Sequence, residues 1–147
     1  MKSDQSLLAV LIGAVSTIPD EILTRILVLS GIGKYSVYEL ASLITTLNRP
    51  DYVLGIILSS EAGGMAAFVF YFYLRKLGSK NLIIKGLLMG LLAWTFLELL
   101  FTWLIEGPKL IPFRPVSDYY IELFGALLWG LVMGLLFKKY LFKKQPI

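Results

Sequence analysis

Four long apolar segments dominate this sequence and limit the folds open to it. They extend over residues 7–29, 52–74, 82–105 and 119–141. A helix that crosses a bilayer needs about 20 mainly apolar residues, because the hydrocarbon core is about 30 Å thick. The sequence therefore predicts an all-α fold, a polytopic transmembrane four-helix bundle that forms a single membrane domain over residues 1–147.

The composition agrees with this prediction and excludes several kinds of chemistry. Hydrophobic residues make up 57% of the chain and charged residues 16%, whereas about a quarter of a soluble domain is charged. The chain has no Cys and no His, which removes thiol chemistry, the commonest zinc ligand and the commonest general base. We therefore expect no enzyme, no cofactor and no bound metal. We also expect no nucleic-acid partner, because most cations behind the net charge of +4 lie at the ends of apolar segments.

The distribution of Lys and Arg predicts the orientation of the chain. With four spans, the termini and the second loop share one side, which carries nine cations against five on the other. The nine are Lys2, Arg75, Lys76, Lys80, Lys85, Lys138, Lys139, Lys143 and Lys144. Cytoplasmic loops are enriched in Lys and Arg. We therefore expect a multi-pass protein of the cell membrane, the bacterial inner membrane, with both termini cytoplasmic.

The first apolar segment has the weakest pattern, because it contains Pro19 and three charged residues. A second interpretation is a cleaved signal peptide that ends at Ala14-Val15-Ser16. Against it, Asp4 offsets Lys2 in a stretch that should be positive. The apolar pattern also resumes after Pro19, which favours a retained first span.

The connection between the first two spans contains its own helical pattern. Ser36 and Glu39 have the spacing of a capping box, in which each side chain accepts from the backbone N–H of the other residue. Apolar residues then recur at helical spacing until Pro50. The sequence predicts a short amphipathic interfacial helix over about 36–48. Such a helix either stabilises the end of the bundle or covers a site.

Small residues recur every four positions in all four spans. Membrane helices associate through such faces, because small side chains let the backbones approach closely. The third and fourth spans contain true GxxxG spacings. We expect these faces to meet in the interior of a compact bundle, with helix packing through Gly13, Gly55, Ser59, Gly63, Gly86, Gly90, Gly130 and Gly134.

Several acidic residues continue these small-residue faces toward the outer half of the bilayer. By helical rise, Glu21, Glu98 and Glu122 converge there, and Asp20 lies on an adjacent face. Arg25 is the cation expected to meet them, since Glu21 and Arg25 form an i, i+4 pair. Acids inside a membrane are costly and often mark functional sites. The cluster therefore predicts a proton, cation or ligand site, and the alternative is that these residues only pair internally.

Glu61 is an isolated acid in the second span. It lies about 160° around the helix from Ser59, away from the small-residue face. A charge facing lipid would cost about 2.5–3.5 kcal/mol or more. We expect Glu61 to be protonated and buried at a second internal interface. The alternative is a contact with its twin in a homodimer, with Ser60 and Gly64 allowing close approach.

The acids share single features with two known families. The stretch DEILTR at 20–25 resembles the EExxxR motif of intramembrane CAAX-type glutamic proteases, but that family also needs histidines, which this chain lacks. The four-span length resembles small multidrug-resistance transporters, whose intramembrane Glu lies in the first span, whereas Glu61 lies in the second.

The architecture as a whole resembles a loose group of uncharacterised small bacterial membrane proteins with four spans. The likeness rests on the amphipathic segment, the LNRPD turn at 47–51 and the run GSKNLIIKGLLMGLLAW at 78–94. It implies a fold and no known activity. Our leading hypothesis is a small transporter or transporter subunit with a proton- or cation-binding acidic cluster. The alternative is a membrane scaffold or regulatory subunit that binds another membrane protein through its glycine faces.

Overall fold

The computed structural model describes residues 2–143, and side chains from Asp4 onward. This part of the chain is helical and contains no strand. Lys144 and the side chain of Lys2, both counted in the charge distribution, lie outside it. The elements in chain order are α1 (Lys2–Val15), α2 (Thr17–Leu29), α3 (Val37–Thr46), α4 (Tyr52–Leu77), α5 (Leu82–Phe101), the π-helix η1 (Thr102–Glu106) and α6 (Val116–Tyr140).

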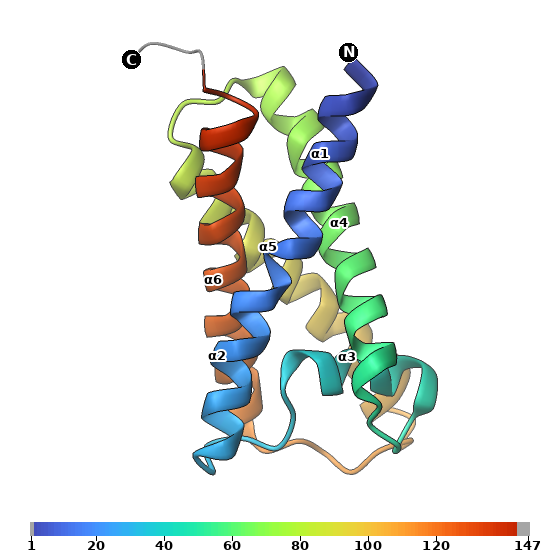
Figure 1. Ribbon diagram of the computed structural model, residues 1–147. Coiled ribbons are helices and arrows are strands. Elements are labelled where there is room, and N and C mark those ends of the chain that lie inside the picture. The colour runs from blue at the N-terminus through green and yellow to red at the C-terminus, as the bar shows by residue number, and fades with distance from the viewer. Residues whose placement is uncertain (1, 144–147) are drawn as a thin grey trace.

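Four described helices are long and apolar enough to cross a membrane, namely Asp4–Leu29, Tyr52–Leu77, Leu82–Glu106 and Val116–Tyr140. They correspond to the four segments predicted from the sequence. Both ends of the chain lie at one end of the molecule, and α3 lies at the other end with the two connections beside it (Figure 1). The fold is therefore that of a multi-pass membrane protein.

The first span is interrupted where the sequence placed its proline. Pro19 has no backbone N–H for the carbonyl of Val15, and its ring crowds that carbonyl. The helix α1 accordingly ends at Val15 and α2 begins at Thr17. The hydroxyls of Ser16 and Thr17 donate to carbonyls of the preceding turn, at 2.7 Å each. The span is thus two helices in series, with a break near its middle.

The third and fourth spans differ from their predicted limits. The third span ends in η1, where the N–H of Gly107 donates to the carbonyl of Thr102 at 2.7 Å. The helix α6 begins at Val116, three residues before the predicted start. Single-turn π-helices are uncommon and occur often at functional sites. Here η1 brings Glu106, its last residue, into a buried position.

The helix predicted in the first connection is present as α3. Ser36 is its N-cap, the N–H of Ser36 donates to Glu39 Oε2 at 2.9 Å, and the Glu39 N–H donates back to Ser36 Oγ. The predicted capping box is therefore confirmed. The helix packs on α4, where Gly55 lies directly against the Tyr38 backbone, and its buried Leu40 and Leu43 form an apolar cluster with Phe101 of α5 and Ile105 of η1.

The glycine faces pair the helices two by two. On one side, Gly13 of α1 lies against Gly63 and Ala67 of α4. On the other side, Gly86 and Gly90 of α5 lie against α6, and a Cβ added to Gly86 would come 2.5 Å from the carbonyl oxygen of Gly130. The α6 face also includes Gly134, whose added Cβ would come 3.1 Å from the carbonyl oxygen of Leu82. A side chain at these positions would therefore separate the helices.

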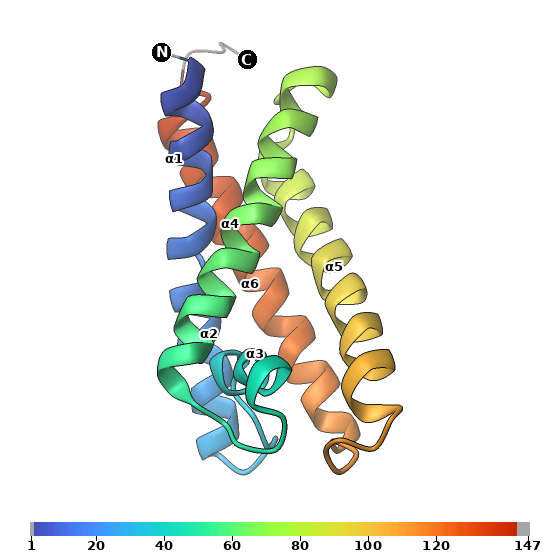
Figure 2. The same ribbon diagram turned by 90° about the vertical axis from the view of Figure 1, so that its right-hand side faces the viewer.

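The four helices do not close into the compact bundle expected from the sequence. The α1–α4 and α5–α6 pairs are joined through α6, which packs on α1 and α2. The helices α4 and α5 make little contact, and Figure 2 shows them diverging toward the end that carries α3. The small faces were expected to share one interior. Instead Gly63 of α4 contacts α1 and Gly55 of α4 contacts α3, while Gly86 and Gly90 of α5 contact α6. Ser59, also expected in the helix packing, lines the gap between α4 and α5.

Candidate functional site

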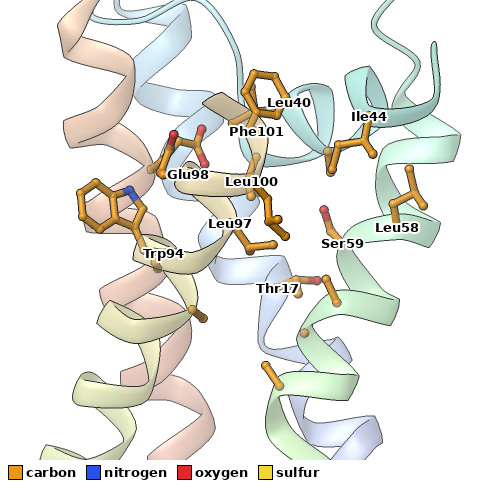
Figure 3. Close-up of a pocket in the computed structure, with 18 of the residues that line it drawn as sticks. Thr17, Leu40, Ile44, Leu58, Ser59, Trp94, Leu97, Glu98, Leu100 and Phe101 are labelled. Atoms are coloured by element: carbon orange, nitrogen blue, oxygen red, sulfur yellow. The ribbon is translucent and has the colours of Figure 1, made fainter. Parts of the chain in front are cut away.

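The gap between α4 and α5 is a cavity of about 400 Å³. Residues of α4 and α5 form its sides, α3 covers one end, and α2 and α6 form its inner wall. In the close-up of Figure 3, Ser59 and Leu58 of α4 face Leu97 and Leu100 of α5, with Leu40 and Ile44 of α3 at the end. A cavity of this size accommodates a small organic molecule.

The cavity opens on the apolar outer surface of the molecule. Several residues on its rim are exposed, among them Ile44, Met65, Leu97 and Leu104. All of them are apolar side chains of helices whose outer faces are themselves apolar. The opening therefore faces the surface that a four-span protein presents to hydrocarbon.

Two acids at the inner wall have carboxyl oxygens without partners. Asp20 of α2 is 7% exposed and Glu122 of α6 is 6% exposed. Asp20 Oδ1 and Glu122 Oε1 have no hydrogen-bond partner in the described part of the chain. Asp20 lies against Gly125 of α6, where any Cβ would overlap its carboxylate. Burying a polar group without a hydrogen bond costs free energy, so a proton or a ligand bound at these oxygens would stabilise the protein.

Two further polar groups of the lining are unpaired within residues 2–143. Ser59 Oγ and Trp94 Nε1 are buried atoms without a hydrogen-bond partner. They come from α4 and α5, on opposite sides of the opening. The cavity thus combines an apolar lining with a few unsatisfied polar groups, which is the composition of small-molecule sites.

Glu21 and Arg25, by contrast, form a completed network outside the cavity. Glu21 accepts from Arg25 Nε at 2.9 Å and from the backbone N–H of Tyr38 at 2.9 Å. Arg25 also pairs with Glu39 at 3.3 Å and lies over the ring of Tyr52. These contacts fasten α3 to α2 and α4. The sequence placed Glu21 and Arg25 in one site with Glu98, whereas in the structure Glu98 lines the cavity and Glu21 and Arg25 hold α3 instead.

Glu98 is paired with a cation that the sequence argument did not place in the interior. Arg114, from the connection before α6, has a fully buried side chain that donates to Glu98 Oε2 at 2.6 Å and also to Glu106 Oε1. Its guanidinium lies between the rings of Phe101 and Tyr119, 4.6 Å from each ring centre. Arg25 is therefore not the cation that meets Glu98.

The surroundings of Arg114 keep it charged. Burial by itself lowers the pKa of the Arg114 guanidinium, but its hydrogen bonds and charge interactions with Glu98 and Glu106 outweigh burial and raise the pKa above its ordinary value. Tyr119 completes the cluster by donating to Glu106 Oε2 at 2.8 Å. The cation is thus committed to two carboxylates and does not pair with the oxygens of Asp20 and Glu122 described above.

Glu61 does not lie at a second internal interface. It is exposed and lies on the rim of the cavity, because α5, the nearest candidate to cover this face of α4, diverges from it. Gly64, which was expected to allow a contact between two copies, packs against Val10 of α1 instead. Glu61 thus borders the same cavity as Asp20, Glu98 and Glu122, and it also borders a second pocket of about 340 Å³ together with Val10, Met65, Phe68 and Val69.

Sequence reasoning did not assign three buried residues of this end of the molecule to the site, namely Glu106, Arg114 and Asp118. Arg114 and Glu106 lie beside a proline-rich connection with no periodic pattern, so nothing in their spacing indicates burial. Asp118 has a buried side chain that accepts from the backbone N–H of Lys34 at 2.6 Å. Its position one turn before Glu122, on the same helix face, is a pattern that could have identified it.

No three acidic side chains among the described residues are placed to hold one metal ion. Asp20, Glu98 and Glu122 share a cavity wall, and their charges interact, but they do not converge on one point. In comparisons with protein-family models, curated proteins and solved structures, no significant match to this chain was found. The function must therefore be argued from the cavity itself.

Proposed function

We propose that the protein is a small, non-enzymatic membrane transporter or transporter subunit, whose binding site is the cavity between α4 and α5. The observation that carries this proposal is the pair of buried, unpartnered carboxyl oxygens of Asp20 and Glu122 at the cavity wall. A carboxyl group without a counter-ion in apolar surroundings is stabilised when it binds a proton or a cation. The site differs from the one expected at first, since Asp20 and Glu122 replace Glu21 and Arg25 at its centre.

The placement of the protein in the membrane forms part of this proposal. Both termini would lie in the cytoplasm, so the cavity and α3 would lie toward the outer side of a bacterial inner membrane. The short helix α3 would then lie at the outer interface, across the end of the cavity. The architectural resemblance to small bacterial four-span proteins supports this arrangement, and the lipid bilayer is the first partner.

The alternative function is a scaffold that binds another membrane protein through its glycine faces. It needs those faces to be free, but Gly13, Gly63, Gly86 and Gly130 are in contact inside the molecule. This leaves the exposed surface around Glu61 as the place where a second copy or another membrane protein would bind. A homodimer there would cover the Glu61 carboxylate and border the cavity.

The proposal is tested with dicyclohexylcarbodiimide, an apolar reagent that modifies protonated carboxyl groups reached from the lipid phase. The full-length protein in lipid nanodiscs is treated with the reagent, and the modified residues are identified by mass spectrometry. We expect modification at Asp20, at Glu122 or at both, because both residues line a cavity that opens on the apolar surface.

Glu21 is the matched control, since it is equally buried but ion-paired to Arg25, and it should stay unmodified. The cavity-filling variant Ala62→Leu should protect Asp20 and Glu122. If neither acid is modified in the wild type, or if Glu21 reacts as fast as they do, the proposed site is wrong.

A further inference from the structure

The charge of the cavity lining indicates what kind of molecule fits it. The lining includes four carboxylic acids, Asp20, Glu61, Glu98 and Glu122, and no basic side chain from the described residues. The nearest buried cation, Arg114, pairs with Glu98 and Glu106. An anionic ligand would therefore meet repulsion, while a cationic group would be attracted to Asp20 and Glu122, which form no ion pair in the described part of the chain.

The unpaired atoms indicate what the charged group must carry. Asp20 Oδ1 and Glu122 Oε1 are acceptors when ionised and need N–H or O–H donors. A protonated amine supplies both a donor and a positive charge, and charge-assisted hydrogen bonds are stronger than neutral ones. A bare metal ion would need several oxygen ligands around one point, and no three described acids are so placed.

The rest of the lining requires an apolar body. Apart from the acids and a few other polar groups, the walls consist of aliphatic and aromatic side chains, including Leu58, Leu97 and Phe101. The opening between α4 and α5 is bordered by exposed apolar residues. A molecule held at the inner wall by its amine can therefore extend an alkyl chain outward between the two helices.

We propose that the cavity binds an amphipathic amine, with its ammonium group at Asp20 and Glu122 and its apolar chain leading out between α4 and α5. This rests on the proposed function in using the same cavity, and it names the class of ligand. The ligand is either a free long-chain amine or the ammonium headgroup of an aminophospholipid, since both present the same chemistry.

The test measures binding of radiolabelled N,N-dimethyldodecylamine to the full-length protein in nanodiscs of phosphatidylcholine, with empty nanodiscs subtracted. The matched probes are 1-dodecanol and dodecanoate, which have the same chain with a neutral or a negative head. We expect the amine to bind at least tenfold more tightly than the alcohol, and dodecanoate to bind least. Equal affinities for the amine and the alcohol would overturn the proposal.

Two variants test the contact of the ammonium headgroup and the contact of the alkyl chain separately. In Asp20→Asn/Glu122→Gln the amine should lose at least tenfold in affinity while the alcohol binds as before, which also shows that the variant is folded. In Ala62→Leu, where the added side chain occupies the cavity, both probes should lose affinity. Unchanged amine binding in the double variant would contradict the assignment of these two acids.

Adding a second lipid to the nanodiscs distinguishes the two possible sources of the ammonium group. When phosphatidylethanolamine is added to the nanodiscs, competition with the probe identifies an aminophospholipid headgroup, and unchanged probe affinity identifies a free amine; both results support an ammonium site. The carbodiimide experiment keeps this inference separate from the proposed function. If the carbodiimide modifies Asp20 or Glu122 but the amine binds no more tightly than the alcohol, the transporter proposal still holds and the proposal of an amine ligand is wrong.

Discussion

Asp20 and Glu21 are neighbours on α2, and they occupy opposite kinds of environment. Both are buried. Glu21 is held by an arginine and a backbone N–H, and it connects three helices. Asp20 lines the cavity, and its Oδ1, which lies against Gly125, has no hydrogen-bond partner among the described residues. For Glu21, contacts within the protein offset the free-energy cost of burying a carboxylate. For Asp20, a bound proton or ligand is needed to offset that cost.

The same contrast holds for Ala62 and Gly63 on α4. Both residues border the cavity, but a Cβ added at Gly63 would point toward α1 and come 2.8 Å from the carbonyl oxygen of Gly13. A side chain added at Gly63 would meet α1, whereas a larger side chain at Ala62 would extend into the cavity. Neighbouring residues of one helix therefore lie either in a tight contact or at the cavity, and substitutions at these positions should have different effects on stability.

The largest loss of stability is expected when Arg114, the most buried cation among the ion-paired residues, is replaced. Arg114→Met leaves Glu98 and Glu106 buried without a counter-charge, and removing one partner of a buried ion pair costs about 3–5 kcal/mol. Unfolding of the purified protein in detergent, followed by circular dichroism, measures this loss. The control Arg49→Met removes an exposed cation and should change stability by less than about 0.5 kcal/mol. Equal effects of the two changes would show that the Arg114 cluster does not stabilise the fold.

A smaller loss is expected from Glu21→Gln, which keeps the shape of the side chain but removes its charge. Hydrogen bonds to charged groups contribute about 1.5–3 kcal/mol, and the variant weakens those to Arg25 and to the N–H of Tyr38. Asp20→Asn provides the comparison, since it removes a charge that has no cation beside it. Its stability should equal or exceed that of the wild type. If both variants lose the same amount in the unfolding assay, the two acids do not differ as described.

Gly63→Ala should lower stability by about 1–3 kcal/mol, the range for overpacking a tight contact. The added Cβ would lie 2.8 Å from the carbonyl oxygen of Gly13 and 2.8 Å from Thr17 Cγ2. Thermal unfolding of the variant in detergent measures the loss. A Gly63→Ala variant as stable as the wild type would indicate that α1 and α4 can separate at little cost.

The smallest effect is expected from Ala62→Leu, although it adds more atoms than Gly63→Ala. Its side chain enters existing space, and cavity-filling changes are commonly neutral or stabilising by about 0.5–2 kcal/mol. The midpoint of thermal unfolding should therefore equal or exceed that of the wild type. A clear decrease would mean that the cavity is narrower than the structure shows.

The spans and the local helix signals could be predicted because their causes are local. Apolar runs of sufficient length define the four spans, and the Ser36–Glu39 spacing defines the start of α3. The predicted glycines lie against neighbouring helices, as Gly13 does against Gly63 and Gly86 against Gly130, whereas Ser59 lines the cavity. The spacings did not distinguish these two environments. They did not identify which face meets which, because GxxxG patterns on different helices are interchangeable in sequence.

The site was only partly predictable, because it depends on how helices diverge. Helical spacing brought Asp20, Glu98 and Glu122 to one end of the molecule, as the structure shows. It could not show that Glu21 would be used in holding α3, nor that Arg114 would enter the interior from a connection without periodicity. The exposure of Glu61 follows from the divergence of α4 and α5, which no single segment encodes.

The short sequence distances within the Arg114 cluster bear on how the molecule is assembled during synthesis. Arg114 reaches Glu106 and Glu98, only 8 and 16 residues earlier in the chain, while Gly13 meets Gly63 across a much longer stretch. Contacts between residues close in sequence form first, because little chain entropy is lost in closing the loop. We therefore expect α5 and α6 to leave the translocation machinery as a preformed hairpin. Its docking onto α1 and α2 would be the last event, and the one that creates the cavity between α4 and α5.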